Sequence, residues 1–505
     1  MQITKTLFKE FLDLPIYAWY HIHNKEKYEW IQRDQYGEVE MPDEDNFEDE
    51  GEEVEKYFLQ LYHPEDILNI SLLTVEEQES ATKTAIDKRV PVIYQWTLST
   101  PDAMTRFDIL EYVSESDTYR HKEIKSKSNI RNKSNGRYTS LKNDLKYDIS
   151  FSAYVLAKNS VPISEHVMVF LNKEYILHDI IDITALFSYE SLNHELMSVT
   201  EVESKIHEIN SAISLDLETL QSRYPYEGSK YKKYYAQKPP KWTIEILSGL
   251  SGERYAKVRS EGLYDLREIP SDKLSIFTPN QGTFITQYQK WQFTDTINLK
   301  NTLDSLEFPL YFYDYETYTS AIPQFQWTHP WQQVFCQYSI HKMEKNWTIE
   351  HYEWIIEDWE KNNHRLIDAM MCDLWSLTQG TFISWNEGFE NGRNEELMEM
   401  YPEHSSNLHY MIKHTFDLML VFKKWLYFEP DCQGSSSLKA VLPALTEITY
   451  ESMPVWNGME AMRVIEKILA WKATEKEISD CLTYCEQDTW AMVAIYKKLL
   501  EALNR

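Results

Sequence analysis

The sequence contains little cysteine and little glycine. Its five cysteines all lie in the last third of the 505 residues, at Cys336, Cys372, Cys432, Cys481 and Cys485. They form neither a disulfide framework nor the paired C-x-x-C motif of a zinc site, which favours a protein of the reducing cytoplasm. The 13 glycines include no phosphate-binding loop of the Walker or Rossmann type. Nucleotide-driven motors and dehydrogenases are therefore disfavoured.

Long apolar segments are also missing. No apolar run approaches the roughly 20 residues that cross a bilayer, and the mean hydropathy is -0.53. Residues 1–8 lack the apolar core of a signal peptide. We therefore expect a cytoplasmic protein without a membrane partner. Its length is too great for one ordinary core and predicts two or three domains.

The charge balance is strongly acidic, with 80 acidic against 51 basic residues and a formal net charge of -29. This argues against a protein that binds nucleic acid in bulk. It does not argue against a nuclease, because carboxylates are the ligands that catalytic magnesium prefers. Basic residues are frequent between positions 122 and 146. This run predicts either a solvated face or a surface that binds nucleic acid, and both interpretations stay open.

Hydrophobic patterning divides the chain into three segments. Residues 1–185 combine a helix pattern at 4–20 with alternating strand patterns at 90–96, 105–112 and 119–125, and residues 186–300 are mainly helical. Residues 301–505 begin with an apolar strand pattern, followed by strands and helices in α/β order. We therefore expect a mixed α/β protein with domains at 1–185 and 301–505, joined by a helical connector at 186–300.

The last segment opens with two acidic residues at the end of a strand pattern. Asp314 and Glu316 close the apolar run that begins at residue 308. Because side chains alternate along a strand, both carboxylates should lie on the same face and reach one metal ion.

Two further motifs follow in the same segment. Asn386 comes directly after a strand pattern, and Glu390 lies four residues later, one turn into a predicted helix. Tyr484 and Asp488 are spaced i and i+4 on an amphipathic helix and should share one face. Three acidic motifs in this order favour a catalytic site over chance.

These motifs resemble those of the DnaQ-like (DEDD) 3′–5′ exonucleases of the ribonuclease H-like fold, in the subclass with Y-x-x-x-D. The resemblance implies that two Mg²⁺ or Mn²⁺ ions are bound by Asp314, Glu316, Glu390 and Asp488. It also implies that Tyr484 positions the attacking water. Two such ions, about 3.5–4 Å apart, stabilise the attacking and leaving oxygens of an in-line displacement.

The second motif departs from the family, which usually has Asp where this chain has Glu390. Asp417 is the alternative ligand. The Asn-x-x-x-acid spacing favours Glu390 and a structural role for Asp417. Short segments around these motifs also resemble an uncharacterised bacterial family, whose members join such a domain to an N-terminal RecB-like nuclease region: 321–325, 389–393, 437–445 and 484–489.

The first segment carries a second acidic pattern. Asp108 lies in one strand pattern, and Glu123 and Lys125 lie on one face of the next. The pattern resembles the core of the restriction-endonuclease-like PD-(D/E)XK fold, and the alternative is an exposed salt bridge, which is common between neighbouring strands. The resemblance implies that Asp108 and Glu123 bind a metal ion and that Lys125 orients water or neutralises phosphate charge. The segments at 3–6 and 148–154 are similar to that family as well, and Glu55 matches the position of an extra metal ligand, usually His.

Two departures concern this first site. Ser150 stands where the resembling helix usually carries Gln, and the N-terminal half contains no cysteine. No iron–sulfur cluster is therefore expected.

We expect a metal-dependent nuclease, with 3′–5′ exonuclease activity in the C-terminal domain and DNA cleavage or binding in the N-terminal one. DNA is favoured over RNA as the partner. The alternative is a nucleic-acid-binding protein in which one or both sites, the N-terminal one first, have lost their chemistry. Protein partners are not predicted.

Overall fold

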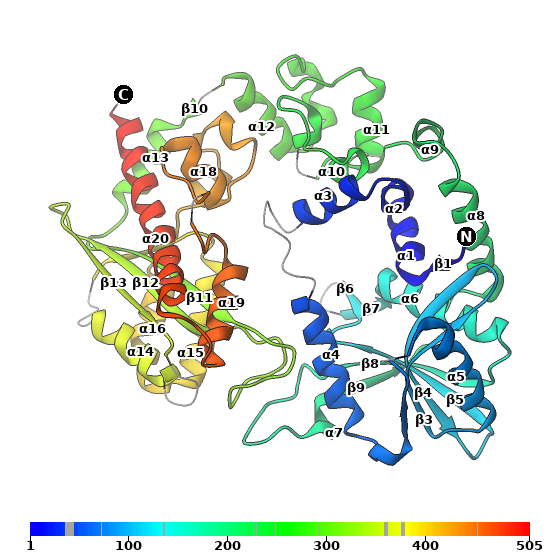
Figure 1. The fold of residues 1–505 in the computed structure, drawn as a ribbon. Helices are drawn as coiled ribbons and strands as arrows, with labels where there is room; N and C mark the ends of the chain where they lie inside the picture. Colours follow the sequence, from blue (N-terminus) through cyan, green and yellow to red (C-terminus); the bar gives the residue numbers. More distant parts are fainter. Residues whose placement is uncertain are drawn as a thin grey trace. The chain divides into compact units, whose positions relative to one another are not determined.

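The computed structural model describes the chain except for residues 36–44, 72, 135–136, 227, 229, 248, 292, 358–361, 375–378, 452 and 505. Contacts divide the chain into two compact units: residues 1–238 with 320–331, and residues 239–319 with 332–505. Each unit combines a mixed sheet with helices (Figure 1), so the expected mixed α/β class is confirmed. Among the described helices, none is long and apolar enough to span a bilayer.

The first unit is built on a sheet in the order β2-β3-β4-β5-β8-β9, with β1 beside β4. Its strands are β1 (Ile3–Thr4), β2 (Ile67–Asn69), β3 (Val92–Ser99), β4 (Ala103–Val113), β5 (Thr118–Lys125), β8 (Ile163–Leu171) and β9 (Phe187–Ser191). Strands β3, β4 and β5 are antiparallel neighbours. Strands β5 and β8 are parallel, and the crossover between them includes α6 (Asn143–Lys158) and the small hairpin of β6 (Arg131–Ser134) and β7 (Arg137–Leu141).

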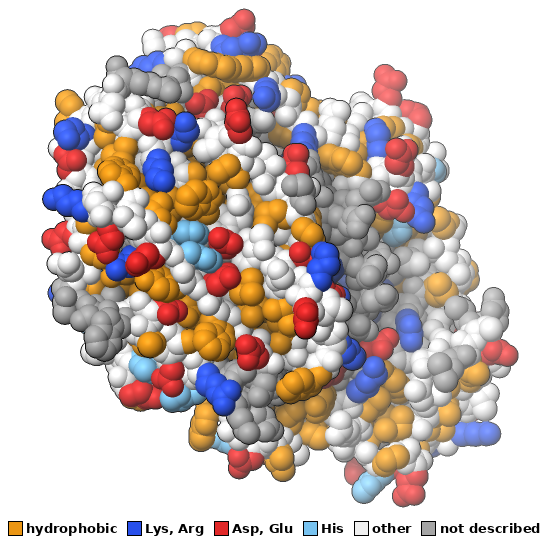
Figure 2. Space-filling model, turned by 60° about the vertical axis from the view of Figure 1, so that its left-hand side comes forward, with side chains coloured by type: hydrophobic (Ala, Val, Ile, Leu, Met, Phe, Trp, Pro, Cys, Tyr) orange, Lys and Arg blue, Asp and Glu red, His pale blue; other side chains and the backbone are white. Residues whose placement is uncertain are grey.

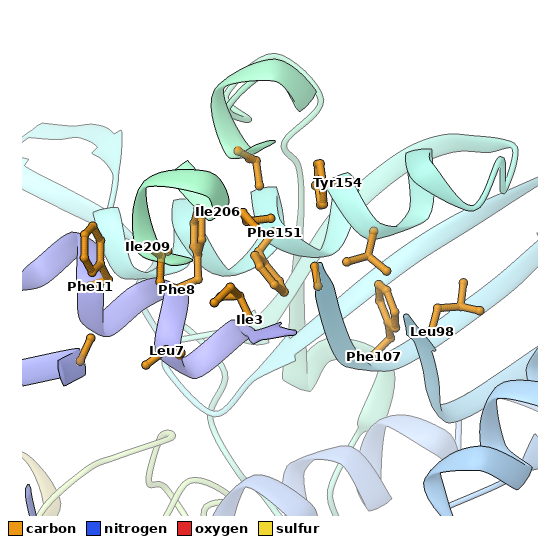
Figure 3. Packing of buried hydrophobic residues seen from close by; sticks show 14 of the residues in the cluster. Ile3, Leu7, Phe8, Phe11, Leu98, Phe107, Phe151, Tyr154, Ile206 and Ile209 are labelled. Atoms are coloured by element: carbon orange, nitrogen blue, oxygen red, sulfur yellow. The ribbon is translucent and has the colours of Figure 1, made fainter. Parts of the chain in front are cut away.

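Helices cover this sheet and form the main core of the first unit. They are α1 (Lys5–Asp13), α2 (Pro15–His23), α3 (Lys25–Gln35), α4 (Asp45–Leu59), α5 (Val75–Asp87), α7 (Ile183–Leu186), α8 (Val199–Ile213), α9 (Leu217–Arg223) and α10 (Tyr231–Tyr235). Figure 3 shows Phe8 of α1, Phe151 of α6 and Ile206 of α8 packed in one cluster, with Phe107 of β4 beneath. Helix α8 thus completes the core of the first unit, although it lies beyond residue 185.

A segment from the middle of the chain also belongs to the first unit. Residues 320–331, here called the 320–331 loop, bury Ala321 and Ile322 in a cluster with Val54 and Phe58 of α4. The indole Nε1 of Trp331 donates a hydrogen bond to the carbonyl of Ser126, at 2.5 Å. The loop therefore packs beside α4 and the end of β5.

The second unit contains a sheet in the order β13-β12-β11-β14-β15. Its strands are β11 (Leu310–Tyr318), β12 (Val334–Met343), β13 (Ile349–Ile355), β14 (Thr381–Ser384) and β15 (Thr415–Asp417). Strands β11, β12 and β13 are antiparallel neighbours. Strand β14 pairs in parallel with β11, and β15 pairs in parallel with β14.

The helices of the second unit are α11 (Gly252–Ser260), α12 (Pro279–Gln289), α13 (Thr296–Asp304), α14 (Asn362–Asp373), α15 (Gly388–Met400), α16 (Ser405–Lys413), α17 (Leu420–Lys423), α18 (Leu438–Leu445), α19 (Gly458–Leu469) and α20 (Glu475–Leu503). Of these, α14, α19 and α20 pack against strands of this sheet. Tyr313 and Tyr315 of β11 pack with Leu366 of α14 and Leu397 of α15. Alternation turns the intervening residue Asp314 to the opposite face, which α20 covers (Figure 1).

The two units divide the chain differently from the three expected segments. Residues 186–238 belong to the first unit and residues 239–300 to the second. The apolar face of α8 is buried against α1 and α6, while β10 (Phe293–Thr294) pairs with β16 (Tyr427–Phe428). The expected connector is therefore shared between the two units, because each half of it finds its apolar partners in a different one.

Candidate active sites

Three of the four predicted ligands of the second unit, Asp314, Glu316 and Asp488, meet between β11 and α20. Asp314 accepts a weak hydrogen bond from the Cys485 thiol, with Sγ 3.9 Å from Oδ2. One ligand atom from each of Asp314, Glu316 and Cys485 lies within 4.8 Å of the others. Glu316 and Asp488 are both buried, and the charge of Asp488 acts on both Asp314 and Glu316. The strand and the helix thus bring together acids that lie more than a hundred positions apart in the sequence.

Glu390 approaches the same cluster from the first turn of α15. A sharp turn at Asn386 joins this helix to β14. Asn386 adopts a left-handed conformation, with φ at 81°, which Asn tolerates better than most residues. The backbone N–H groups of Asn386 and Met419 both donate to Oδ1 of Asp417, at 3.0 Å each. The carboxylate of Asp417 therefore holds the turn, while the Oε2 atom of Glu390 is buried without a hydrogen-bond partner.

The cluster has an excess of negative charge. Burial and the charges of Asp488, Glu316 and Glu390 raise the pKa of Asp314 well above its usual range. Burial, followed by the charge of Asp488, raises the pKa of Glu316 to about 8. Burial, followed by the charge of Asp417, raises the pKa of Glu390 to about 8, and burial raises the pKa of Asp488. Buried carboxylates that raise one another's pKa are a group that a cation would stabilise.

One lysine faces these acids. Burial lowers the pKa of Lys439, although the charges of Asp488, Glu316 and Asp314 oppose this. Its Nζ donates to the carbonyl of Trp456 at 2.6 Å. One ammonium group balances only part of the charge of four carboxylates. The residues therefore fit a divalent cation, because a buried acid is stable only when its charge is compensated.

Two tyrosines complete the site. The Tyr450 hydroxyl donates to Oδ1 of Asp488 at 2.5 Å. Tyr484 is 4% exposed, and the Nζ of Lys439 lies 5.4 Å from its ring centroid. Burial and the charges of Asp488, Glu316 and Asp314 raise the pKa of Tyr484 well above its usual range. Its phenol is therefore protonated at neutral pH and acts as a hydrogen-bond donor.

The predicted residues of the first unit lie in a different electrostatic setting. The Nζ of Lys125 binds Oε1 of Glu123 at 2.8 Å and Oδ2 of Asp148 at 2.9 Å. The Nζ of Lys5 binds the same two carboxylates, each at 2.8 Å. Although burial opposes it, the charges of Lys125 and Lys5 lower the pKa of Glu123 well below its usual range. Lys9 also binds Oδ2 of Asp148, at 3.2 Å, so three lysines neutralise two buried acids. Asp108 accepts from the backbone N–H of Ile124 at 2.7 Å.

Glu55 is bound by two consecutive residues of β3. Tyr94 and Gln95 both donate to its Oε2 atom, at 2.7 and 2.5 Å. Consecutive strand residues normally point to opposite faces. Gln95 has a φ of 51°, and this left-handed conformation lets both side chains reach one carboxylate. A strained residue inside a strand is typical of a functional site.

Burial and the charges of Glu123 and Glu55 raise the pKa of Asp108 well above its usual range. Asp108, Glu123 and Glu55 are therefore close enough for the charge of one to change the pKa of another. Among the described residues, two groups of three side chains have ligand atoms within 4.8 Å of one another, and neither group includes these acids.

The basic run of the first unit is largely paired with acids. Lys122 binds Glu111 at 3.0 Å, and Lys127 binds Asp144 at 2.8 Å. Arg131 forms ion pairs with two acids, Glu190 and Glu195. A phosphate that binds the run must therefore compete with carboxylates. On the face drawn in Figure 2, which brings the left-hand side of Figure 1 forward, acidic and basic side chains are also interspersed.

Comparison with known proteins gives one match. A protein-family model described as a domain of unknown function (DUF2779) matches residues 311–437. The matched part contains Asp314, Glu316 and Glu390 but ends before Tyr484 and Asp488. No curated protein and no solved structure matches significantly.

Four site residues were not predicted: Lys439, Tyr450, Lys5 and Asp148. Lys5 and Asp148 lie in segments that resemble the N-terminal nuclease family, and Lys439 lies in the resembling segment 437–445. Tyr450 has no motif around it. Ser150, the departure noted above, accepts from the backbone N–H of Met197 at 3.0 Å and has a structural partner of its own.

Proposed function

We propose that this protein is a metal-dependent nuclease whose second unit removes nucleotides from the 3′ ends of DNA. The observation that supports this most is the cluster of four carboxylates on three separate elements, with one lysine among them. Glu316, Glu390 and Asp488 are buried and Asp314 is partly buried. Carboxylate oxygens are what Mg²⁺ and Mn²⁺ prefer. The motif order resembles that of the DnaQ-like exonucleases of the ribonuclease H-like fold.

Asp314, Glu316, Glu390 and Asp488 would hold the metal ions. The ions would stabilise negative charge on the attacking and leaving oxygens of the phosphodiester. Oε2 of Glu390, buried without a partner, is a free acceptor for such an ion.

The remaining residues act on water and on the ligands. Tyr484 keeps its proton at neutral pH, so it can donate a hydrogen bond to a water molecule and fix its position. Tyr450 orients the Asp488 carboxylate through its short hydrogen bond. Lys439 offsets part of the negative charge and keeps the acids close together.

For the first unit we propose that it binds DNA, or cleaves it through a restriction-endonuclease-like site at Asp108, Glu123 and Lys125. The pairing of Glu123 with two lysines favours binding over cleavage, because a metal ion would have to displace an ammonium group from that carboxylate. For the whole protein, five free cysteines, all in the second unit, favour a reducing cytoplasm.

The deciding experiment is degradation of DNA and RNA strands labelled at the 3′ or the 5′ end, with Mg²⁺, Mn²⁺ or EDTA. Asp314→Asn should lower the rate of 3′ trimming by at least about 10²–10³-fold, as when one group that stabilises the transition state is removed. Glu395→Gln, an exposed change on α15, is the matched control. Full activity in a folded Asp314→Asn protein would refute the assignment.

Any cleavage that survives in Asp314→Asn should disappear when Asp108 is also replaced by Asn. If no such cleavage exists, the first unit is a binding module, which is the alternative function.

A further inference from the structure

A second set of metal-ligating side chains lies on the α20 face of the same sheet. His341 of β12 and His351 of β13 are directly opposite each other in the antiparallel register. Their rings are stacked, with centroids 4.4 Å apart. Glu486 of α20 lies beside them, and one ligand atom from each of the three residues lies within 4.8 Å of the others. None of the three belongs to the carboxylate cluster.

A hydroxyl network holds one nitrogen of each imidazole. His341 Nδ1 is 2.8 Å from Oγ1 of Thr489, and His351 Nε2 is 2.9 Å from Oγ of Ser339. The two hydroxyls are 2.8 Å apart, and Thr489 also donates to the carbonyl of Glu486 at 3.0 Å.

One hydrogen-bond arrangement satisfies all of these contacts. The Thr489 proton goes to the carbonyl of Glu486, so its oxygen accepts from the Ser339 hydroxyl and from His341 Nδ1–H. The Ser339 oxygen then accepts from His351 Nε2–H. Lone pairs remain on His341 Nε2 and His351 Nδ1. Hydrogen bonds that fix the far nitrogen of an imidazole are typical of histidine metal ligands.

The distances suit a small transition-metal ion. His351 Nδ1 lies 3.7 Å from Oε1 of Glu486. Tetrahedral zinc with ligands at about 2.0–2.1 Å places its ligand atoms roughly 3.3 Å apart. Small movements of the partly exposed Glu486 would therefore close the site. Glu353, two residues after His351, has a buried Oε2 atom without a hydrogen-bond partner and is available as a further oxygen ligand.

We propose that His341, His351 and Glu486 bind a divalent transition-metal ion of the zinc class. Two neutral imidazoles and a carboxylate are the donor set of zinc sites and favour such ions over Mg²⁺, which prefers oxygen ligands alone. The bound ion would join α20 to β12 and β13. Asp488 lies two residues after Glu486 on α20, so the bound ion would also hold in place the helix that carries Asp488. The proposal does not depend on the nuclease assignment.

The test uses the full chain, stripped with EDTA and then kept in excess Mg²⁺ to saturate the carboxylate cluster. Titration with Co²⁺, followed by its visible absorption, should give one tightly bound equivalent per chain. Zn²⁺ should displace it and abolish the colour. His351→Gln and Glu486→Gln change partly exposed side chains, and each should weaken binding by at least about 10–100-fold.

Two controls make every outcome decisive. His404→Gln removes a histidine that pairs with Asp368 in the same unit, and binding should remain unchanged. Asp314→Asn tests whether the coloured ion sits in the carboxylate cluster. The proposal is overturned if no Co²⁺ binds, if folded His351→Gln and Glu486→Gln proteins bind as the parent does, or if binding is lost in either control.

Discussion

Replacing Glu316 by Gln should stabilise the second unit when no metal ion is bound, although it removes a proposed ligand. Burial and the charge of Asp488 raise the pKa of Glu316 from 4.5 to about 8. Between these two values the folded protein holds a proton that the unfolded chain has released, so stability falls as the pH rises from 4.5 to 8. The amide of Gln does not ionise and avoids this loss.

The size of the effect follows from the width of that pH window. At pH 7 the penalty extends over about 2.5 pH units, at 1.36 kcal/mol each, or about 3 kcal/mol. A buried Gln amide that lacks a full set of hydrogen bonds costs about 1 kcal/mol. The expected net gain in the free energy of unfolding is therefore about 2 kcal/mol at pH 7. The gain should vanish near pH 5, because the loss from deprotonation has then fallen to about the 1 kcal/mol that the amide costs.

Urea unfolding in EDTA at pH 5, 7 and 8, followed by tryptophan fluorescence and circular dichroism, measures this gain. Glu395→Gln, exposed on α15, is the control and should show no pH-dependent difference from the parent. Saturating Mg²⁺ should reverse the order, because the parent then gains binding energy that the variant lacks. The electrostatic argument is refuted if Glu316→Gln is no more stable than the parent at pH 7 in EDTA. It is also refuted if the gain in the free energy of unfolding does not change with pH.

Three further predictions concern the two sites. Mg²⁺ or Mn²⁺ binding should release protons and strengthen as the pH rises from 6 to 8, because carboxyls with raised pKa must ionise; calorimetry in two buffers measures this, and a pH-independent affinity would contradict it. Tyr450→Phe should shift that pH dependence toward higher pH. The hydrogen bond from Tyr450 lowers the pKa of Asp488, so its removal raises that pKa. Lys5→Met should destabilise the first unit by about 3–5 kcal/mol in urea, because it leaves Glu123 and Asp148 buried with fewer counter-charges; stability equal to the parent would show that Lys125 and Lys9 suffice.

Much of the fold follows from local patterns that sequence alone contains. Alternating apolar residues predicted strands near residues 90–96, 105–112 and 119–125, and the structure has β3, β4 and β5 there. The helix expected over residues 4–20 is interrupted because Pro15 begins a new helix, α2. Strand and helix periodicity also placed Asp314 with Glu316 and Tyr484 with Asp488, and these pairs meet at β11 and α20.

Contacts between distant segments could not be predicted in this way. Lys439 and Tyr450 reach the carboxylate cluster through tertiary packing, and a lysine near acids has no periodic signature. The left-handed Gln95 interrupts the alternation of β3 with no glycine to signal it. Residues 186–300 were predicted to form one connector because their pattern is mainly helical. Their apolar side chains pack into two different units, which the pattern does not indicate.

The 320–331 loop sets an order of events on the ribosome. The first unit needs Ala321 and Ile322 to fill its cluster beside α4, yet residues 239–319 of the second unit must be synthesised before them. At 5–20 residues per second, about 80 residues take roughly 4–16 s. During that interval the nascent first unit exposes the apolar surface around Val54 and Phe58. The first unit can therefore complete this cluster only after residues 239–319 of the second unit have been synthesised.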